Sequence, residues 1–546
     1  MWAARGFPNL PGVRPRLHTL LASCLVGALL CAGGCGGRDE PADLIIVNGA
    51  EPESLDPQIV SGQPEMRVVS SLFEGLTRFN ARTGDPEPAL ASHWELSPDG
   101  LVYTFHLRTN LTWSTGEPIT AGDFAWSWLR VLKPATAADY AALLFYLKNA
   151  EEFHLGQLAD EQAVGVRALD DHTLRVELVS PTAFFLSLCA FPPLAVVPPD
   201  VVGRHGDQWI RTQPLKTSGA YTLEFWRIND RIRLRRNLRY WDNANTQNDL
   251  VDLLPITSAT TALNLYLNGQ ADIVWDKNLV PVHLTDALRG RPDFHTFDYL
   301  GSYFVRFNVT RKPFDDTRVR KAFAMAIDRQ RIVERVTRGG EKPAATLVPL
   351  STANYLPAEG LQHDPAEARR LFAEAGFPGG RGFPAVSYLL NAGTSGSADE
   401  KVAVELQAMW RDVLGVEVSL RPMEWKTYLA TMSTLDYDLC RSSWIADYND
   451  PNTFLDMFLS NSGNNRTGWK DARYDEIIRR ANATVELQPR AEIFREAETY
   501  LLREVALIGP IYSYAGFNYY DPEKIAGIHP NPIDQHPISA IQRLRR

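Results

Sequence analysis

The 546-residue sequence contains only five cysteines and none of the short motifs that mark the common enzyme classes. It has no CxxC pair, which excludes a cysteine zinc site, and no HExxH motif, P-loop, GxSxG nucleophile elbow or GxGxxG fingerprint. Its histidines are scattered, with no pair at the spacing of metal ligands or of a catalytic dyad. These absences argue against an enzyme, and they give no reason to expect a cofactor or a metal.

Positive charge is also in short supply, since the formal net charge is −9. An acidic surface repels nucleic acid and anionic lipid headgroups, so neither is an expected partner. The chain is too long for one hydrophobic core, which predicts two or three domains. Its 13 Trp, 19 Tyr and 24 Phe supply the apolar area for such cores and argue against global disorder.

The N-terminal 34 residues resemble a secretory signal. Arg5, Arg14 and Arg16 form a basic segment without acidic residues, and the largely apolar run 17–30 follows them. This run is shorter than the roughly 20 residues of a spanning helix, so a transmembrane anchor is the weaker alternative. We therefore expect an exported protein.

Small residues before Cys35 resemble a lipobox, in which the cysteine is lipidated and becomes the mature N-terminus. The pattern departs at Ala32, where a lipobox usually has Leu. We expect a lipid on Cys35 to attach the protein to a membrane, with ordinary cleavage and a soluble product as the alternative. Cys189 and Cys440 lie in apolar stretches and are expected to be buried thiols rather than a disulfide.

Helical and strand-like patterns alternate along the rest of the chain. Asp364 and Pro365 are an N-cap and a first helical residue, and Gly376 follows at the expected C-terminal end. Such alternation is typical of α/β lobes. Helices are predicted to begin at Asp316 and at Asp364, and a third helix is predicted over 399–414. Strands are predicted over 101–107 and 416–420.

The segment RSSWIADYNDPNTF, residues 441–454, places Asp447 between Trp444 and Tyr448. A carboxylate among large aromatic side chains is partly desolvated, and a ligand ammonium group would offset that cost. Residues 447–450 loosely resemble a calcium loop, but the required Gly and terminal Glu are missing. We therefore predict a site for a cationic ligand group, with no metal.

Several long stretches resemble the oligopeptide-binding proteins of ABC importers, bacterial solute-binding protein family 5, cluster C. They follow the family's order through nearly the whole mature chain and include NGAEPESLDPQIVSGQPE (48–65), LFEGLTRF (72–79), DFAWSWLR (123–130), SGAYTLEFW (218–226), FNVTRKPFDDTRVRKAFAMAIDR (307–329), MEWKTYL (423–429) and ADYNDPNTFLDMF (446–458).

The resemblance implies an α/β two-lobed periplasmic-binding-protein clamshell, type II, with an extra domain inserted in the first lobe. It further implies a monomer in the periplasm or cell envelope that captures oligopeptides between its lobes and delivers them to an ABC permease in the cytoplasmic membrane. The expected boundaries are a signal peptide at 1–34, lobe I at 40–73, 202–299 and 515–546, the extra domain at 74–201 and lobe III at 300–514.

Site residues also follow from the resemblance. Asp447 would hold the ligand α-ammonium, and Tyr140 would contact the ligand backbone unless it only packs in a core. Ser61, Gly62 and Gln63 would form an edge that pairs with the ligand strand, with a plain surface turn as the alternative. The remaining expected ligand-binding residues, for which a structural role is the alternative, are Ser443, Trp444, Trp425, Phe304 and Tyr514.

The sequence departs from the family pattern at residues that would bind the C-terminal carboxylate of the ligand. Met432 stands where one family arginine would be, and Asp399 or Glu400 falls where a histidine is common. Arg441 is the basic residue left to meet a ligand carboxylate, unless it pairs with a neighbouring acid. A ligand-contacting asparagine of the family falls on Asp276 or Asn278, and two family cysteines are replaced by Gly301 and Ile445.

These departures leave other functions open. The same scaffold would suit a non-peptide or a C-terminally modified peptide, and a surface sensor or scaffold is a further alternative. Loss of binding on N-acetylation of a peptide would favour peptide capture, whereas C-terminal amidation would have little effect.

Overall fold

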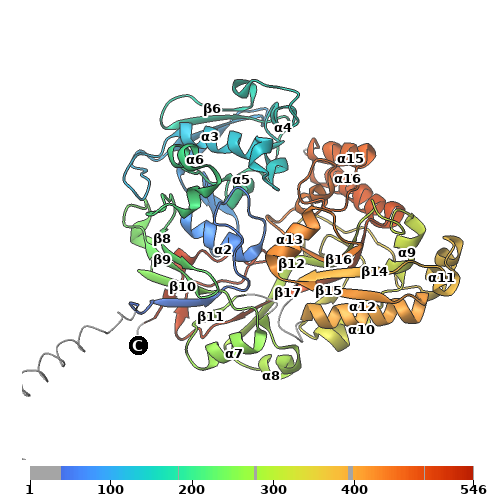
Figure 1. Cartoon of the computed structure of the whole chain (residues 1–546). Helices are drawn as coiled ribbons and strands as arrows, with labels where there is room; N and C mark the ends of the chain where they lie inside the picture. The colour runs from blue at the N-terminus through green and yellow to red at the C-terminus, as the bar shows by residue number, and fades with distance from the viewer. Residues whose placement is uncertain (1–38, 183, 276–278, 392–397, 485, 545–546) are drawn as a thin grey trace, which may run out of the picture. The chain divides into compact units, whose positions relative to one another are not determined.

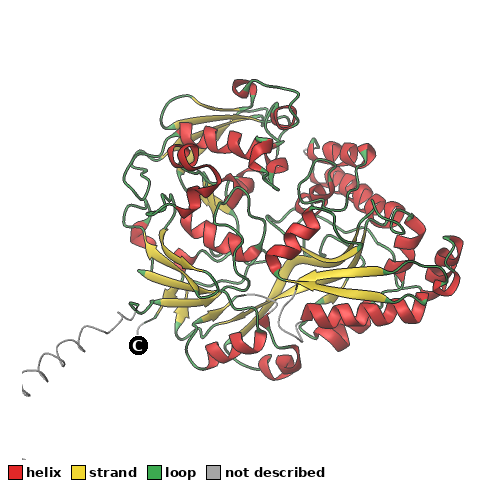
Figure 2. Ribbon diagram, in the orientation of Figure 1, coloured by secondary structure: helices red, strands yellow, loops and turns green. Residues whose placement is uncertain are grey.

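The computed structural model describes residues 39–544, apart from 183, 276–278, 392–397 and 485 (Figure 1). Residues 43–546 form one unit and residues 1–42 another. In the larger unit, helices flank the strands of a large sheet (Figure 2). Within the described ranges, no helix is long and apolar enough to cross a membrane.

The large sheet combines eleven of the described strands from distant parts of the chain. Strand β13 (Lys342–Pro343) pairs with β17 outside the main order. Parallel and antiparallel pairs both occur along the sheet, so it is mixed. The main order is β15 (Val418–Met423), β14 (Val386–Asn391), β16 (Leu439–Ile445), β12 (Phe294–Phe307), β17 (Ile508–Tyr519), β11 (Ile273–Val274), β1 (Leu44–Val47), β10 (Leu250–Leu254), β9 (Arg231–Arg236) and β8 (Tyr221–Arg227).

The long strands β12 and β17 join the two halves of this sheet. One end of β17 pairs with β11, whereas the far end of β12 pairs with β16. Their register shifts between Asp298 and Ser302, as in a bulge that bends a strand pair. The chain therefore passes between the halves along two adjacent strands (Figure 1).

Residues 91–177 add a separate antiparallel sheet. Its order is β4 (Ala91–Leu96), β5 (Val102–Leu107), β7 (Thr173–Glu177) and β6 (Val166–Ala168). Along β5 the side chains alternate between half-buried and buried, which confirms the strand predicted for 101–107. Helix α3 (Ala121–Leu132) packs against this sheet, and a Thr120–Asp123 capping box starts it.

The helices predicted from the sequence are present. Helix α11 (Pro365–Glu374) begins where the Asp364 side chain accepts hydrogen bonds from two backbone N–H groups, and Gly376 follows its end with φ +99°. Helix α9 (Thr317–Met325) is capped by Asp316, and α12 spans Ala398–Leu414. The strand predicted at 416–420 lies two residues later, at β15, because the preceding turn is longer than the pattern indicated.

The apolar core of the described residues divides into several clusters. One cluster draws on residues between 76 and 196, together with Tyr448. A second combines residues from 44–73, 195–275 and 520–541, and two more draw mainly on residues 299–514. The chain thus fills separate cores, as its length requires.

A buried ion pair fixes the segment that leads to residues 61–63. The Arg130 Nη2 of α3 lies 2.7 Å from Asp56 Oδ2, and both side chains are nearly inaccessible to solvent. Trp209 Nε1 donates to the same carboxylate oxygen at 2.8 Å. The pair holds the segment around Asp56 on α3. Removing Asp56 would leave the Arg130 guanidinium buried without a counter-charge, which is strongly unfavourable.

We predict that Asp56→Ala lowers the free energy of unfolding by about 3–5 kcal/mol, the scale for leaving a buried partner unpaired. Urea unfolding followed by tryptophan fluorescence measures this. Asp298→Ala removes the exposed Asp298–Lys342 pair and is the control, with an expected change below about 1 kcal/mol. Equal effects of the two substitutions would contradict the prediction.

Candidate functional site

A cavity of about 450 Å³ lies where the start of helix α2 (Gln63–Leu72), helix α13 (Trp425–Ser433) and the end of strand β16 meet. Its volume is in the range of small-molecule sites. The structure brings nine of the predicted residues to its wall: Ser61, Gly62, Gln63, Tyr140, Trp425, Arg441, Ser443, Trp444 and Asp447.

The other predicted residues lie elsewhere. Phe304 is fully buried and packs edge-on against Phe458 in an apolar cluster, which is the structural alternative that the sequence left open. Tyr514 lies behind the wall, where its hydroxyl accepts a hydrogen bond from Arg441 Nη2 at 3.1 Å. Asn278, its alternative Asp276, and Cys35 fall outside the described residues.

Strand β16 offers an open edge to the cavity. It pairs with β12 along its whole length, from Leu439 to Ile445. Its other edge pairs with β14 only at Leu439 and Cys440. In the described part of the chain, residues 441–445 therefore have no strand on that side, and Ser443 and Trp444 line the cavity there.

Asp447 is buried without a counter-ion. The residue is 8% exposed, and Thr453 Oγ1 lies 3.3 Å from its Oδ2. Among the described residues, no Lys, Arg or His forms an ion pair with this carboxyl group. Burial raises the pKa of Asp447 well above its usual range, Asp456 raises it further, and the Thr453 hydrogen bond lowers it. A ligand cation would offset this unfavourable environment.

Tyr140 lies beside this carboxyl group and also packs against other aromatic rings. Its ring centroid is 6.1 Å from that of Trp444 and 5.0 Å from that of Phe191. The side chain is 6% exposed and both packs in an apolar cluster and lines the cavity, and its contact with the ligand backbone stays a prediction.

Arg441 has an acidic neighbour. Its Nε lies 3.5 Å from Asp399 Oδ1, and the two side chains are only 4% and 5% exposed. Asp399 also lines the cavity, as does the buried Met432. The pairing alternative left open by the sequence is therefore present, and contact of Arg441 with a ligand stays a prediction.

Two wall contacts join distant segments, and the sequence did not predict either. Trp425 Nε1 donates to Glu65 Oε1 at 3.2 Å, linking α13 to α2. Arg466 forms an ion pair with Asp139 and donates to Ser61 Oγ at 3.3 Å. In the sequence, Glu65 follows a helix-starting proline and Arg466 lies in a polar stretch. Neither local pattern predicts a contact between distant segments.

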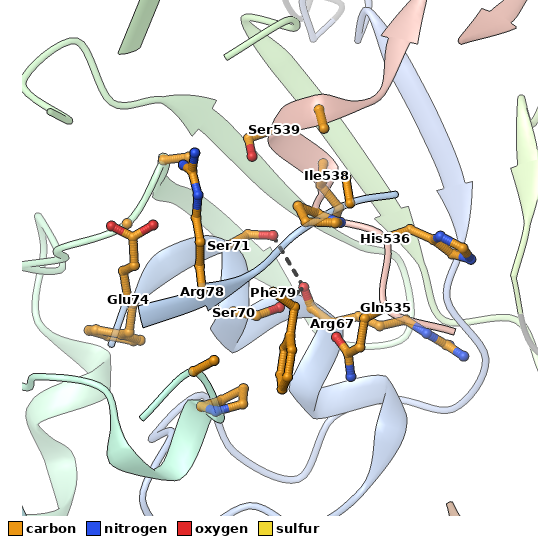
Figure 3. Close-up of a pocket in the computed structure, with 18 of the residues that line it drawn as sticks. Arg67, Ser70, Ser71, Glu74, Arg78, Phe79, Gln535, His536, Ile538 and Ser539 are labelled. Atoms are coloured by element: carbon orange, nitrogen blue, oxygen red, sulfur yellow. Dashed lines mark hydrogen bonds between the residues drawn. The ribbon is translucent and has the colours of Figure 1, made fainter. Parts of the chain in front are cut away.

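A second cavity of about 280 Å³ adjoins the first, since Gln63, Met66 and Gln535 line both. Figure 3 shows Arg67, Ser70 and Ser71 of α2 and the C-terminal segment 535–539 around it. Its charged groups are matched internally, because Arg78 pairs with Glu87 and Asp242. The uncompensated Asp447 makes the larger cavity the better candidate site.

The joined halves of the sheet and the enclosed cavity define a ligand-binding protein of the two-lobed clamshell class. Residues 85–466 match the family described as bacterial extracellular solute-binding proteins, family 5 Middle. The chain belongs to this family, and the fold predicted from the sequence is confirmed.

Its relatives include the periplasmic oligopeptide-binding protein OppA of Salmonella typhimurium, which is 37% identical over 92% of this chain and 94% of the relative. A probable deoxycholate-binding periplasmic protein of Escherichia coli, YgiS, is 34% identical over 85% of this chain and 86% of the relative.

A solved structure of the Escherichia coli murein tripeptide-binding protein MppA is similar, with a TM-score of 0.87 at 33% identity, covering 93% of this chain and 99% of that one. An unliganded open form of MppA gives a TM-score of 0.61. The overall similarity of this chain is therefore greater to the first MppA structure than to the open form.

We predict that Glu65→Gln changes the pH dependence of stability. Burial raises the pKa of Glu65 to about 7, above the ordinary value of 4.5 that applies when the chain is unfolded. The folded protein therefore prefers the protonated acid, and the wild type loses stability as the pH rises from about 4.5 to above 7. Relative to Glu65→Gln, the loss should approach about 3 kcal/mol.

Urea unfolding of both proteins at pH 5 and pH 8 measures this difference, with the exposed Glu417→Gln as a control substitution. The free energy of unfolding of Glu65→Gln, relative to that of the wild type, should be greater at pH 8 than at pH 5. An identical difference at the two pH values would show that Glu65 ionises freely in the folded protein.

Proposed function

We propose that this chain is the substrate-binding component of a peptide ABC transporter, which captures oligopeptides between its two lobes and delivers them to a membrane permease. The names of the relatives support this assignment. The observation that carries it is the buried Asp447 carboxyl group, which has no counter-ion among the described residues. A peptide α-ammonium group would meet that need.

The open edge of β16 supports strand-like capture. An extended peptide beside residues 441–445 would add a strand to the sheet, with main-chain hydrogen bonds that do not depend on sequence. Gly62 stands on the cavity wall with extended backbone angles, φ −94° and ψ 152°. A side chain there would collide with Glu65 Oε2, which a Cβ would approach to 2.2 Å.

The proposed boundaries are those expected from the sequence, with lobe I at 40–73, 202–299 and 515–546, the extra domain at 74–201 and lobe III at 300–514. The division of the apolar clusters supports them. We further propose a monomer without catalytic activity, tethered in the periplasm by a lipid on Cys35. Membership in a family of binding proteins supports the absence of catalysis.

A second candidate keeps the scaffold but changes the ligand to a non-peptide or a C-terminally modified peptide. Asp399 faces Arg441 in the cavity and reduces its capacity to receive a ligand carboxylate. A relative described as a probable deoxycholate-binding protein shows that ligand assignments vary within the family.

We predict that Asp447→Ala weakens the binding of an unblocked peptide by about 2–5 kcal/mol, the usual scale for breaking a buried charged pair. Isothermal titration calorimetry measures the affinity, and the exposed Asp207→Ala is the matched control. N-acetylation of the peptide should weaken wild-type binding similarly and add little to the effect of Asp447→Ala. Unchanged affinity in the Asp447 variant would refute the ammonium assignment.

We predict that Cys35→Ala moves the protein from the membrane fraction to the soluble fraction of the envelope, because one cysteine would carry the whole anchor. Metabolic labelling with a radioactive fatty acid, followed by fractionation, reports both attachment and location. Cys189→Ala is the control, since that buried thiol should not affect either readout. Labelling that persists in Cys35→Ala would place the lipid elsewhere.

A further inference from the structure

Buried arginines in the described chain are nearly all well supplied with acceptors. Four of them pair with an aspartate. Arg320 and Arg329 have no such pair, but backbone carbonyl oxygens accept most of their hydrogen bonds. The four pairs are Arg130–Asp56, Arg233–Asp252, Arg441–Asp399 and Arg490–Asp450.

Arg306 is the exception. It is 2% exposed, and Nη1 donates to the Asn464 carbonyl oxygen at 3.1 Å while Nη2 meets the weakly accepting sulfur of Met457 at 3.5 Å. Its Nε has no hydrogen-bond partner in the described structure, which is also true of the Nε of Arg441 and of Arg466, but those two arginines each pair with an aspartate. A guanidinium has five N–H donors, so most of its capacity is unused.

Among the described residues, no acidic side chain forms an ion pair with Arg306, and a second arginine lies nearby. It stands on the cavity wall with Asn464 and Arg466. Burial lowers the pKa of Arg306, whereas Tyr437 and Cys440 raise it, and Arg466 lowers it. Arg466 itself is paired with Asp139. The rings of Phe304 and Phe458, 5.7 and 5.8 Å from the guanidinium carbon, give only partial compensation.

The pairing register of β12 and β16 places Arg306 away from Asp447, the proposed site of the ligand ammonium group. It lies opposite Cys440 near one end of β16, and Asp447 follows the other end of that strand. Cross-strand partners share a face, so Arg306 lies on the same face as Ser442 and Trp444, which also line the cavity. The cavity thus holds an unpaired acid and an unpaired base at separate positions along one strand.

We propose that Arg306 is a specificity-determining residue that receives a carboxylate of the bound ligand, from an acidic side chain or from the C-terminus. A carboxylate accepts two parallel N–H bonds from one guanidinium, which matches the unused donors of Arg306. This inference rests on the proposed function, because it assumes a peptide held at Asp447 and lying along β16.

The test uses unblocked alanine pentapeptide amides with a single Glu at position 2, 3, 4 or 5, each compared with its Gln counterpart, and the alanine pentapeptide as free acid. Calorimetry on the wild type should show at least one carboxylate-bearing peptide binding about tenfold or more tightly than its neutral partner. A preferred Glu position identifies the side chain as the source, and a preferred free acid identifies the C-terminus.

Arg306→Gln should abolish this preference while neutral peptides keep their affinity to within about threefold. Arg329→Gln is the matched control, because it also removes a buried arginine but lies outside the cavity, and it should leave the preference unchanged. If Arg306→Gln does not fold, Arg306→Lys should retain a preference reduced by the loss of bidentate geometry.

If the wild type bound all of these peptides with affinities within about threefold of one another, the role of Arg306 would be overturned, while peptide capture would stand. A preference that persists in Arg306→Gln would assign it to another residue and would also overturn the inference. If even the neutral alanine pentapeptide amide did not bind, the proposed function would fail together with this inference.

Discussion

The site depends on one constraint, a buried carboxyl group that has no counter-ion among the residues that the structure describes. Removing a charge from water is unfavourable unless a partner replaces the lost solvation, so Asp447 at 8% exposure favours either protonation or a bound cation. The surrounding aromatic rings, the open edge of β16 and the contact between α2 and α13 create this environment together. In the proposed mode of binding, free energy would be concentrated on one ligand group, while the backbone of the ligand would be held without regard to its sequence.

The fold supplies that environment by bringing distant segments together. Among the described strands, only β12 and β17 carry the large sheet from one half to the other, and their register breaks between Asp298 and Ser302. Such a narrow connection suits movement of the halves, and the two forms of MppA show that a family member adopts more than one arrangement. Contacts such as Arg466 with Asp139 form only when segments on both sides of the cavity meet, so they would stabilise the arrangement described above.

Sequence patterns predicted the helices and strands well, whereas the role of Asp447 at the site stays a prediction. Asp364 and Gly376 bound a helix as expected, because capping is a local property. Asp447 was identified from its neighbours Trp444 and Tyr448, which are adjacent in the chain. Phe304 was expected at a pocket but packs in an apolar cluster, although it lies on the same face of β12 as Arg306. Elements distant in the sequence decide which part of a strand face borders a cavity, and alternation of side chains does not reveal it. Arg306 escaped notice for the same reason, since its lack of acidic partners depends on strands far apart in the sequence.

The central claim concerns which ligand group meets Asp447, and a crystal structure of the protein with an unblocked Glu-containing peptide tests it most directly. We predict that the α-ammonium nitrogen of the peptide lies within hydrogen-bond distance of the Asp447 carboxylate. The peptide backbone should lie along residues 441–445, and a carboxylate of the peptide should contact Arg306. A peptide bound in the reverse direction, or an Asp447 that contacts only water, would contradict it.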